Sequence, residues 1–132
     1  MDRLEGHEMK KVQVRKLSGA ALDWAVAIAE KLEPVAHEGE ALVRCREETA
    51  GVVITSYEEF SPRQNWAHAG PIIDREDILL NKTSNGRHSA QLFGKIGNPC
   101  MGDTKLVAAM RAFVGAYLGD EVLVPKVLME KK

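Results

Sequence analysis

The sequence predicts an α+β domain in which two principal helices pack against one small mixed or antiparallel β-sheet. Residues 19–31 and 104–118 repeat apolar side chains at the spacing of an amphipathic helix. Several shorter runs are rich in β-branched residues or alternate polar and apolar side chains, which is typical of strands. The chain has 132 residues, a length that fits a single domain over residues 1–132.

A flexible end, a strand and the first helix are expected at the N-terminus. Residues 1–10 are polar and are expected to be flexible, with the folded core over residues 11–125. Residues 11–15 alternate in polarity and predict a short strand. Ser18 is placed to cap the first helix, which is expected over residues 19–31.

The middle of the chain predicts a hairpin followed by irregular structure. Residues 35–40 are expected to form a loop after the first helix. Residues 41–45 and 51–57 are two β-branched runs that can pair as a hairpin. Residues 63–73 are expected to be irregular, because a Gly-Pro pair disfavours the helical conformation immediately before the proline. Residues 74–80 fit either one helical turn or a short strand.

The last third predicts a strand, the second helix and a final strand. Residues 81–86 form a polar turn cluster, and residues 89–95 alternate as a strand would. Asp103 is the expected cap of the helix over residues 104–118. Residues 122–124 then predict a short terminal strand.

A row of small residues on the second helix suggests a further contact. Ala108, Ala112 and Gly115 lie on the side of this helix away from its main apolar stripe. Such a row permits close packing. If the row is left uncovered in the monomer, a homodimer is the simplest arrangement that would bury it. Packing of the row against the first helix is the equally reasonable alternative.

Charge and composition exclude several broad classes of protein. The formal net charge is −1, which gives no general attraction to nucleic acid or to an anionic membrane. No segment approaches the roughly 18 apolar residues that a membrane span needs. The first dozen residues are charged, unlike a signal peptide, so a cytoplasmic protein with reduced Cys45 and Cys100 is expected.

The sequence contains no recognisable catalytic, cofactor or metal motif. The run at residues 97–104 resembles a phosphate-binding loop in spacing, but Asp103 stands where the phosphate-binding lysine would be. We therefore predict no ATP or GTP binding by this loop. The four histidines are isolated from one another, which predicts no metal site. No cofactor and no catalytic residue is assigned, and an enzyme is the less favoured interpretation.

The candidate binding surface is a loop that holds an aromatic ring, an imidazole and a charged turn. Loops on a rigid scaffold often carry recognition residues, and tryptophan and arginine are common at interface hot spots. Trp66 is equally well explained as a core plug, and Trp24 is more often core than contact. The candidate residues are Trp66, His68, Gly70, Pro71, Asp74 and Arg75, with Asp23 and Trp24 from the first helix.

Three stretches together resemble the NinX-like family of small phage and prophage proteins. They are residues 17–27 (LSGAALDWAVA), residues 57–76 with the run WAHAGPIIDRE, and residues 106–122 (LVAAMRAFVGAYLGDEV). The resemblance implies a phage or prophage origin, a location in the bacterial cytoplasm and an accessory role. This chain departs from the family at Asn65, where members often have aspartate, and over residues 35–51, which are longer and more charged.

The interpretation we favour is an accessory phage protein that binds a host or phage protein and performs no chemistry of its own. The alternative is a small-molecule-binding protein or small enzyme with a pocket near residues 66–76. A nucleic-acid-associated factor is the third interpretation, and a marked basic face would favour it.

Overall fold

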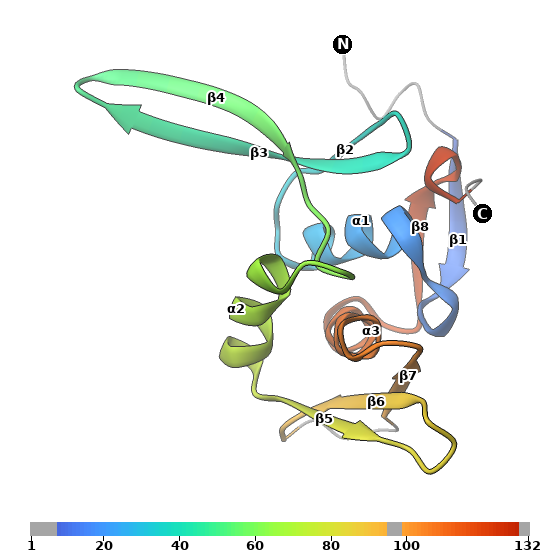
Figure 1. Ribbon diagram of the computed structural model, residues 1–132. Helices are drawn as coiled ribbons and strands as arrows, with labels where there is room; N and C mark the ends of the chain where they lie inside the picture. The colour runs from blue at the N-terminus through green and yellow to red at the C-terminus, as the bar shows by residue number, and fades with distance from the viewer. Residues whose placement is uncertain (1–7, 95–98, 130–132) are drawn as a thin grey trace.

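The computed structural model describes residues 8–94 and 99–129 (Figure 1). Over these residues three α-helices and eight strands confirm the α+β class. Two 3₁₀ turns, η2 (Val14–Lys16) and η3 (Lys126–Leu128), follow the first and the last strand. Structure therefore continues past residue 125, and it begins before residue 11, because the first strand starts at Met9.

Two helices lie where the apolar spacing predicts them. Helix α1 (Gly19–Ala29) ends two residues before the predicted boundary, and α3 (Lys105–Leu118) follows the predicted range closely. The cap of α3 differs from the prediction. Thr104 Oγ1 accepts the Val107 backbone N–H at 3.1 Å, whereas the predicted cap, Asp103, forms an ion pair with Arg87 at 3.4 Å.

A third helix, α2 (Trp66–Glu76), occupies the stretch that was expected to be irregular. Asn65 caps it, with its side-chain oxygen accepting the Ala67 N–H at 2.9 Å. Pro71 lies inside the helix and removes one backbone donor. Gly70 lacks the Cβ that would meet the proline ring in a helical conformation, and burial of Ile72 anchors the helix to the core. The prediction was wrong because capping and burial outweigh the cost of one proline.

The strands form three small antiparallel sheets instead of one. β1 (Met9–Gln13) pairs with β8 (Glu121–Pro125). The second sheet has the order β2-β3-β4 and the third has the order β5-β6-β7. Their strands are β2 (Val35–His37), β3 (Glu40–Thr49), β4 (Val52–Glu59), β5 (Ile78–Lys82), β6 (His88–Leu92) and β7 (Cys100–Gly102).

Several strand boundaries differ from the sequence prediction. The hairpin is confirmed as β3 and β4, but the expected loop at residues 35–40 contains β2, which pairs with the start of β3. Residues 74–80 are divided between the last turn of α2 and the start of β5. The first predicted strand is shifted by two residues, because Val14 already belongs to η2.

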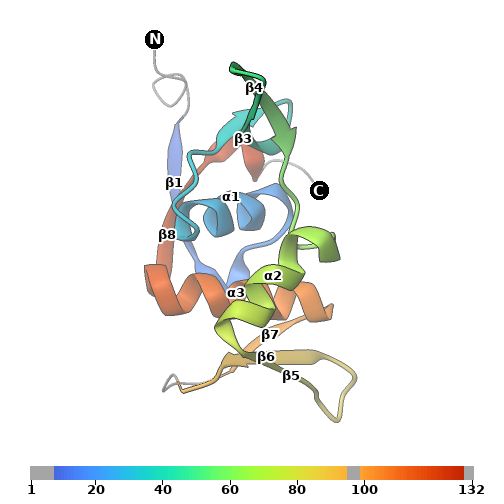
Figure 2. The same cartoon turned by 90° about the vertical axis from the view of Figure 1, so that its left-hand side faces the viewer.

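The core lies between α1, α3 and the sheets around them. Helix α3 packs against α1 on one side and against the β5-β6-β7 sheet on the other, as both views show (Figures 1 and 2). Helix α2 crosses one side of α3 (Figure 2). The largest fully buried side chains include Trp24, Leu22, Phe113 and Met110, so the centre is formed by the two helices that the sequence predicts.

The small-residue row on α3 is used inside the monomer. Ala108 and Ala112 are buried, Ala108 lies against Gly102 of β7, and the half-buried Gly115 lies near Val14 of η2. The row is therefore not the uncovered surface on which the predicted homodimer depended. No helix in the described part of the chain has the length and apolarity needed to cross a bilayer.

Candidate functional site

Trp66 is exposed at the first position of α2. Its side chain is 54% exposed, which excludes the alternative in which it plugs the core. Trp24, by contrast, is 2% exposed on α1 and belongs to the core, as the composition of its helix favoured. The two tryptophans therefore do not share a surface.

Because Trp66 is exposed, its truncation should cost little stability. We expect Trp66→Ala to change the free energy of unfolding by less than about 1 kcal/mol, since substitutions of exposed side chains usually have small effects and the Asn65 cap of α2 is retained. Urea unfolding followed by circular dichroism measures this change. A loss of several kcal/mol would show that the indole packs against the core.

Asp23 is a buried carboxyl rather than part of a contact surface. Its side chain is 2% exposed, and Oδ2 lies 3.1 Å from Nε of Arg63. Oδ1 accepts the Arg63 backbone N–H, also at 3.1 Å. Burial raises the pKa of Asp23 to about 7, and the attraction of Arg63 offsets only part of that rise. The pair fastens the segment between β4 and α2 to helix α1.

His68 secures the same segment from the other end. Its Nδ1 accepts the Ser61 backbone N–H at 3.0 Å, and its ring stacks on Phe60 with the ring centroids 5.4 Å apart. Phe60 in turn donates its backbone N–H to the Ala41 carbonyl at the start of β3. The imidazole therefore has a structural role between β4 and α2.

Arg75 is held in a network between α1, α2 and α3. Its Nη1 and Nη2 contact both carboxylate oxygens of Glu30 at 3.3 and 3.0 Å, and its Nε donates to Glu76 at 2.8 Å. Glu76 also accepts the Tyr117 hydroxyl at 2.7 Å. The guanidinium lies 5.8 Å from the centroid of the Phe113 ring. These contacts join three helices, and they occupy the side chain that was predicted to face a partner.

The predicted site residues therefore do not gather on one surface. Gly70 and Pro71 belong to the middle of a helix instead of a rigid turn, and Asp74 is exposed on the same helix. A cavity among the described residues lies elsewhere, and its lining includes no residue of α2. Among the described residues, no three His, Cys, Asp or Glu side chains gather as a metal site requires.

The most prominent exposed feature is an arm formed by β3 and β4. The two strands pair continuously from Leu42 opposite Glu59 to Thr49 opposite Val52. A two-residue turn with positive φ at Ala50 (54°) and Gly51 (80°) closes the hairpin, which is the geometry that twisted hairpins favour. The arm projects away from the helices (Figure 1). Every residue of β4 is exposed, so no other described element packs over this strand, whereas the start of β3 packs against α1.

Large apolar side chains lie along β4 without cover. Val52 is 58% exposed, Val53 45%, Ile54 55% and Tyr57 44%. Because side chains alternate across a strand, Val52 and Ile54 lie on one face of the arm, and Val53 and Tyr57 lie on the other. The sequence predicted these strands, but it could not show that nothing packs against them.

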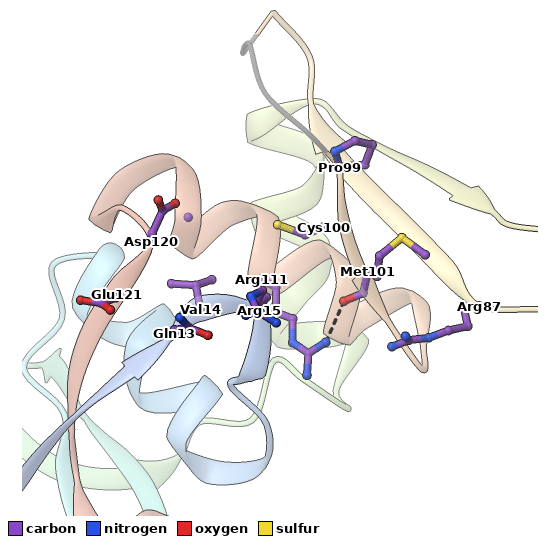
Figure 3. Close-up of a pocket in the computed structure, with 11 residues that line it drawn as sticks. Gln13, Val14, Arg15, Arg87, Pro99, Cys100, Met101, Arg111, Asp120 and Glu121 are labelled. Carbon is purple, nitrogen blue, oxygen red and sulfur yellow. Dashed lines mark hydrogen bonds between the residues drawn. The ribbon is translucent and has the colours of Figure 1, made fainter.

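A second feature is a cavity of about 980 Å³ beside α3 (Figure 3). The charged side chains of its lining come from η2, from α3, from the turns before β6 and β8, and from β8 itself. Arginines lie toward one side of the view and the two acidic residues toward the other. The charged residues are Arg15, Arg87, Arg111, Asp120 and Glu121.

The amino-acid sequence alone indicates no role for these arginines. Arg15, Arg87 and Arg111 are far apart along the chain, so only the fold brings them to one cavity. One local signal exists. After its first residue, Lys105, helix α3 carries a single charged side chain, Arg111, among apolar and small residues. A lone charge in an apolar helix needs a specific partner.

The comparison with protein families gives one match. Residues 13–116 match the family model described as "Bacteriophage P22, NinX". The matched range begins in β1 and ends in the last turn of α3, so it includes all three helices, the arm and most of the cavity lining. No curated protein matches the chain.

Proposed function

This chain belongs to the NinX family of bacteriophage P22, and we propose that it is an accessory phage protein that binds a protein of the phage or of its bacterial host. On this proposal it acts in the bacterial cytoplasm, performs no chemistry of its own, and uses the β3–β4 arm as its binding surface. One observation carries the proposal: four large apolar side chains of β4 are exposed on a strand that no other described part of the chain covers.

Stability of the free chain does not explain the arm. An isolated two-stranded hairpin is marginally stable in water, because it lacks a packed face. Exposed apolar area costs roughly 25 cal/mol per Å² compared with burial, and contiguous apolar patches on monomers often mark interaction sites. A partner that covers β4 would recover this free energy.

The chemistry of the arm indicates what kind of partner fits it. Strand β4 is an edge of its sheet, so its outer backbone groups are available to pair with a strand of another protein. On the face with Val52 and Ile54, the charged side chains are Glu47 and Glu58, as the register shows. A partner with an apolar patch bordered by basic side chains would complement that face.

Replacement of apolar residues on this face should weaken partner binding. We expect Val52→Ser combined with Ile54→Ser to reduce affinity by about 30-fold, because truncation of two interface anchors costs roughly 2 kcal/mol in total. Tagged wild-type and variant proteins are used to capture proteins from a phage-infected host. A captured protein that depends on the arm is then purified and titrated against both chains by calorimetry.

The matched control is Leu123→Ser on β8, where an equally exposed leucine (57%) lies outside the arm. This control should retain wild-type affinity, and circular dichroism should show that all three chains are folded. If each captured protein binds the arm variant and the wild type equally well, the arm is not the binding surface.

A further inference from the structure

Arg111 is the best-anchored of the cavity arginines. Its Nε donates to the Leu17 carbonyl at 2.8 Å, and its Nη1 donates to the Met101 carbonyl at 2.7 Å. A guanidinium has five N–H donors, so these two bonds leave three donors. Both acceptors are neutral carbonyl groups, and they fix the orientation of the side chain without neutralising its charge.

No carboxylate in the described part of the chain forms an ion pair with Arg111. Burial lowers the pKa of Arg111, and the neighbouring charge of Arg87 lowers it further. Asp103 acts in the opposite direction, but its ion pair is with Arg87. A half-buried, uncompensated positive charge is unfavourable unless an anion approaches it. The described part of the chain therefore supplies no carboxylate that pairs with Arg111, and a bound anion could fill that role.

Two further arginines line the same cavity. Arg15 and Arg87 are exposed, and both line the cavity together with Arg111. At the other side the lining includes Asp120 and Glu121, of which Glu121 also forms an ion pair with Lys11 at 3.9 Å. A volume of about 980 Å³ lies in the range of sites for small organic ligands.

We propose that this cavity binds a small phosphate monoester, with its phosphoryl group on Arg111, Arg87 and Arg15 and a hydroxyl- or amino-bearing end toward Asp120 and Glu121. Guanidinium groups match the oxygen geometry of phosphate, and several can share one dianion. The acidic side disfavours a second phosphate, so a monoester fits better than a triphosphate. The same acidic side disfavours a continuous nucleic-acid backbone.

This site differs from the phosphate loop that the sequence analysis rejected. A phosphate loop binds through backbone N–H groups, whereas residues 100–102 are a strand paired with β6. Residues 97 and 98 of that motif lie outside the described residues. In the proposed site, arginine side chains make the contacts, and the strand contributes only part of the wall.

The test compares ligands with wild-type and variant protein. Inorganic phosphate, glucose 6-phosphate and O-phosphoethanolamine are titrated by calorimetry at constant ionic strength. We expect saturable binding of at least one monoester, about tenfold tighter than inorganic phosphate, because its second end contacts the acidic side. Arg15→Gln combined with Arg87→Gln should weaken this binding at least tenfold. Arg44→Gln, which removes an arginine of the arm, should leave it unchanged.

Cys100 provides an independent measurement at the same cavity. Its half-buried thiol is part of the lining, and Cys45 on β3 lies outside the cavity and serves as an internal reference. A bound monoester should slow alkylation of Cys100 by iodoacetamide several-fold and leave the rate at Cys45 unchanged.

Three results would overturn the proposal. The first is no saturable heat from either monoester at about 10 mM, a concentration that reveals even weak sites. The second is equal binding by wild type and the double variant. The third is tighter, salt-sensitive binding of a single-stranded oligonucleotide, which would assign the arginines to a nucleic-acid backbone. If inorganic phosphate binds as tightly as the monoesters, Asp120 and Glu121 make no contribution to ligand binding.

Discussion

Gly102→Ala is expected to lower the free energy of unfolding by about 3 kcal/mol, at the upper end of the usual cost of overpacking a tight contact. A Cβ on Gly102 would lie 2.6 Å from the Ala108 backbone nitrogen and 3.0 Å from both Ala108 Cα and Val107 Cγ1. Two of these three neighbours are backbone atoms of α3, so they cannot rotate away. Either β7 or the first turns of α3 must move.

Gly115→Ala is the matched control on the same helix. Its Cβ would lie 3.9 Å from Val14 Cγ1, an ordinary van der Waals distance. Alanine also favours a helix interior over glycine by roughly 1 kcal/mol, so this change should stabilise the protein slightly. Urea unfolding of both variants measures the contrast. If the two substitutions have similar effects, β7 and α3 are not in the close contact that the structure shows.

The tightness at Gly102 also affects how nucleotide binding should be tested. Substitution of this glycine by a larger residue would disturb the fold whether or not a ligand binds, so a loss of binding in such a variant would not identify a phosphate loop. The prediction that this loop does not bind ATP or GTP is therefore better tested by titration of the wild-type protein with each nucleotide.

Local patterns predicted the central helices well, since each carries apolar residues at helical spacing and is buried over most of its circumference. They failed for α2, where Pro71 suggested irregular chain. Its helical conformation depends on the Asn65 cap and on burial of Ala69 and Ile72 against the rest of the protein. The burial is a tertiary effect, and no rule about the residue before proline includes it.

The candidate site was less predictable than the fold, because its contacts join residues that are distant in sequence. Asp23 meets Arg63 across 40 positions, and Arg75 meets Glu30 across 45. A charged residue on a predicted turn resembles a contact residue until its partner is known. Exposure of the arm is equally a property of the whole fold, because the same alternating strands would be buried under a third layer.

The Asp23–Arg63 pair is one of these contacts between residues that are distant in sequence. Its pH-dependent effect on the free energy of unfolding is the largest effect that we expect. The carboxyl is 2% exposed, and burial raises its pKa from 3.8 to about 7. In the unfolded chain the group titrates near its ordinary value. Between these two values the folded state holds a proton that the unfolded state has released.

The sign of the pH dependence follows from this difference. The contribution of Asp23 to stability is fully present below about pH 4, falls as pH rises through about 7, and is constant above that range. A shift of this size corresponds to about 4 kcal/mol, at 1.36 kcal/mol per pH unit. The Arg63 guanidinium limits the loss, because it stabilises the ionised form.

Asp23→Asn should remove this pH dependence, because the amide cannot ionise but its oxygen can still accept the Arg63 N–H. Urea unfolding of both proteins is measured from about pH 5 to about pH 8, with Asp74→Asn as an exposed control. We expect the stability of wild type relative to Asp23→Asn to decrease from about pH 5 to about pH 7 and then to level off, while the difference for Asp74→Asn stays nearly constant. The opposite slope, with wild type gaining relative stability as pH rises, would mean that attraction to Arg63 exceeds the cost of burying the Asp23 charge.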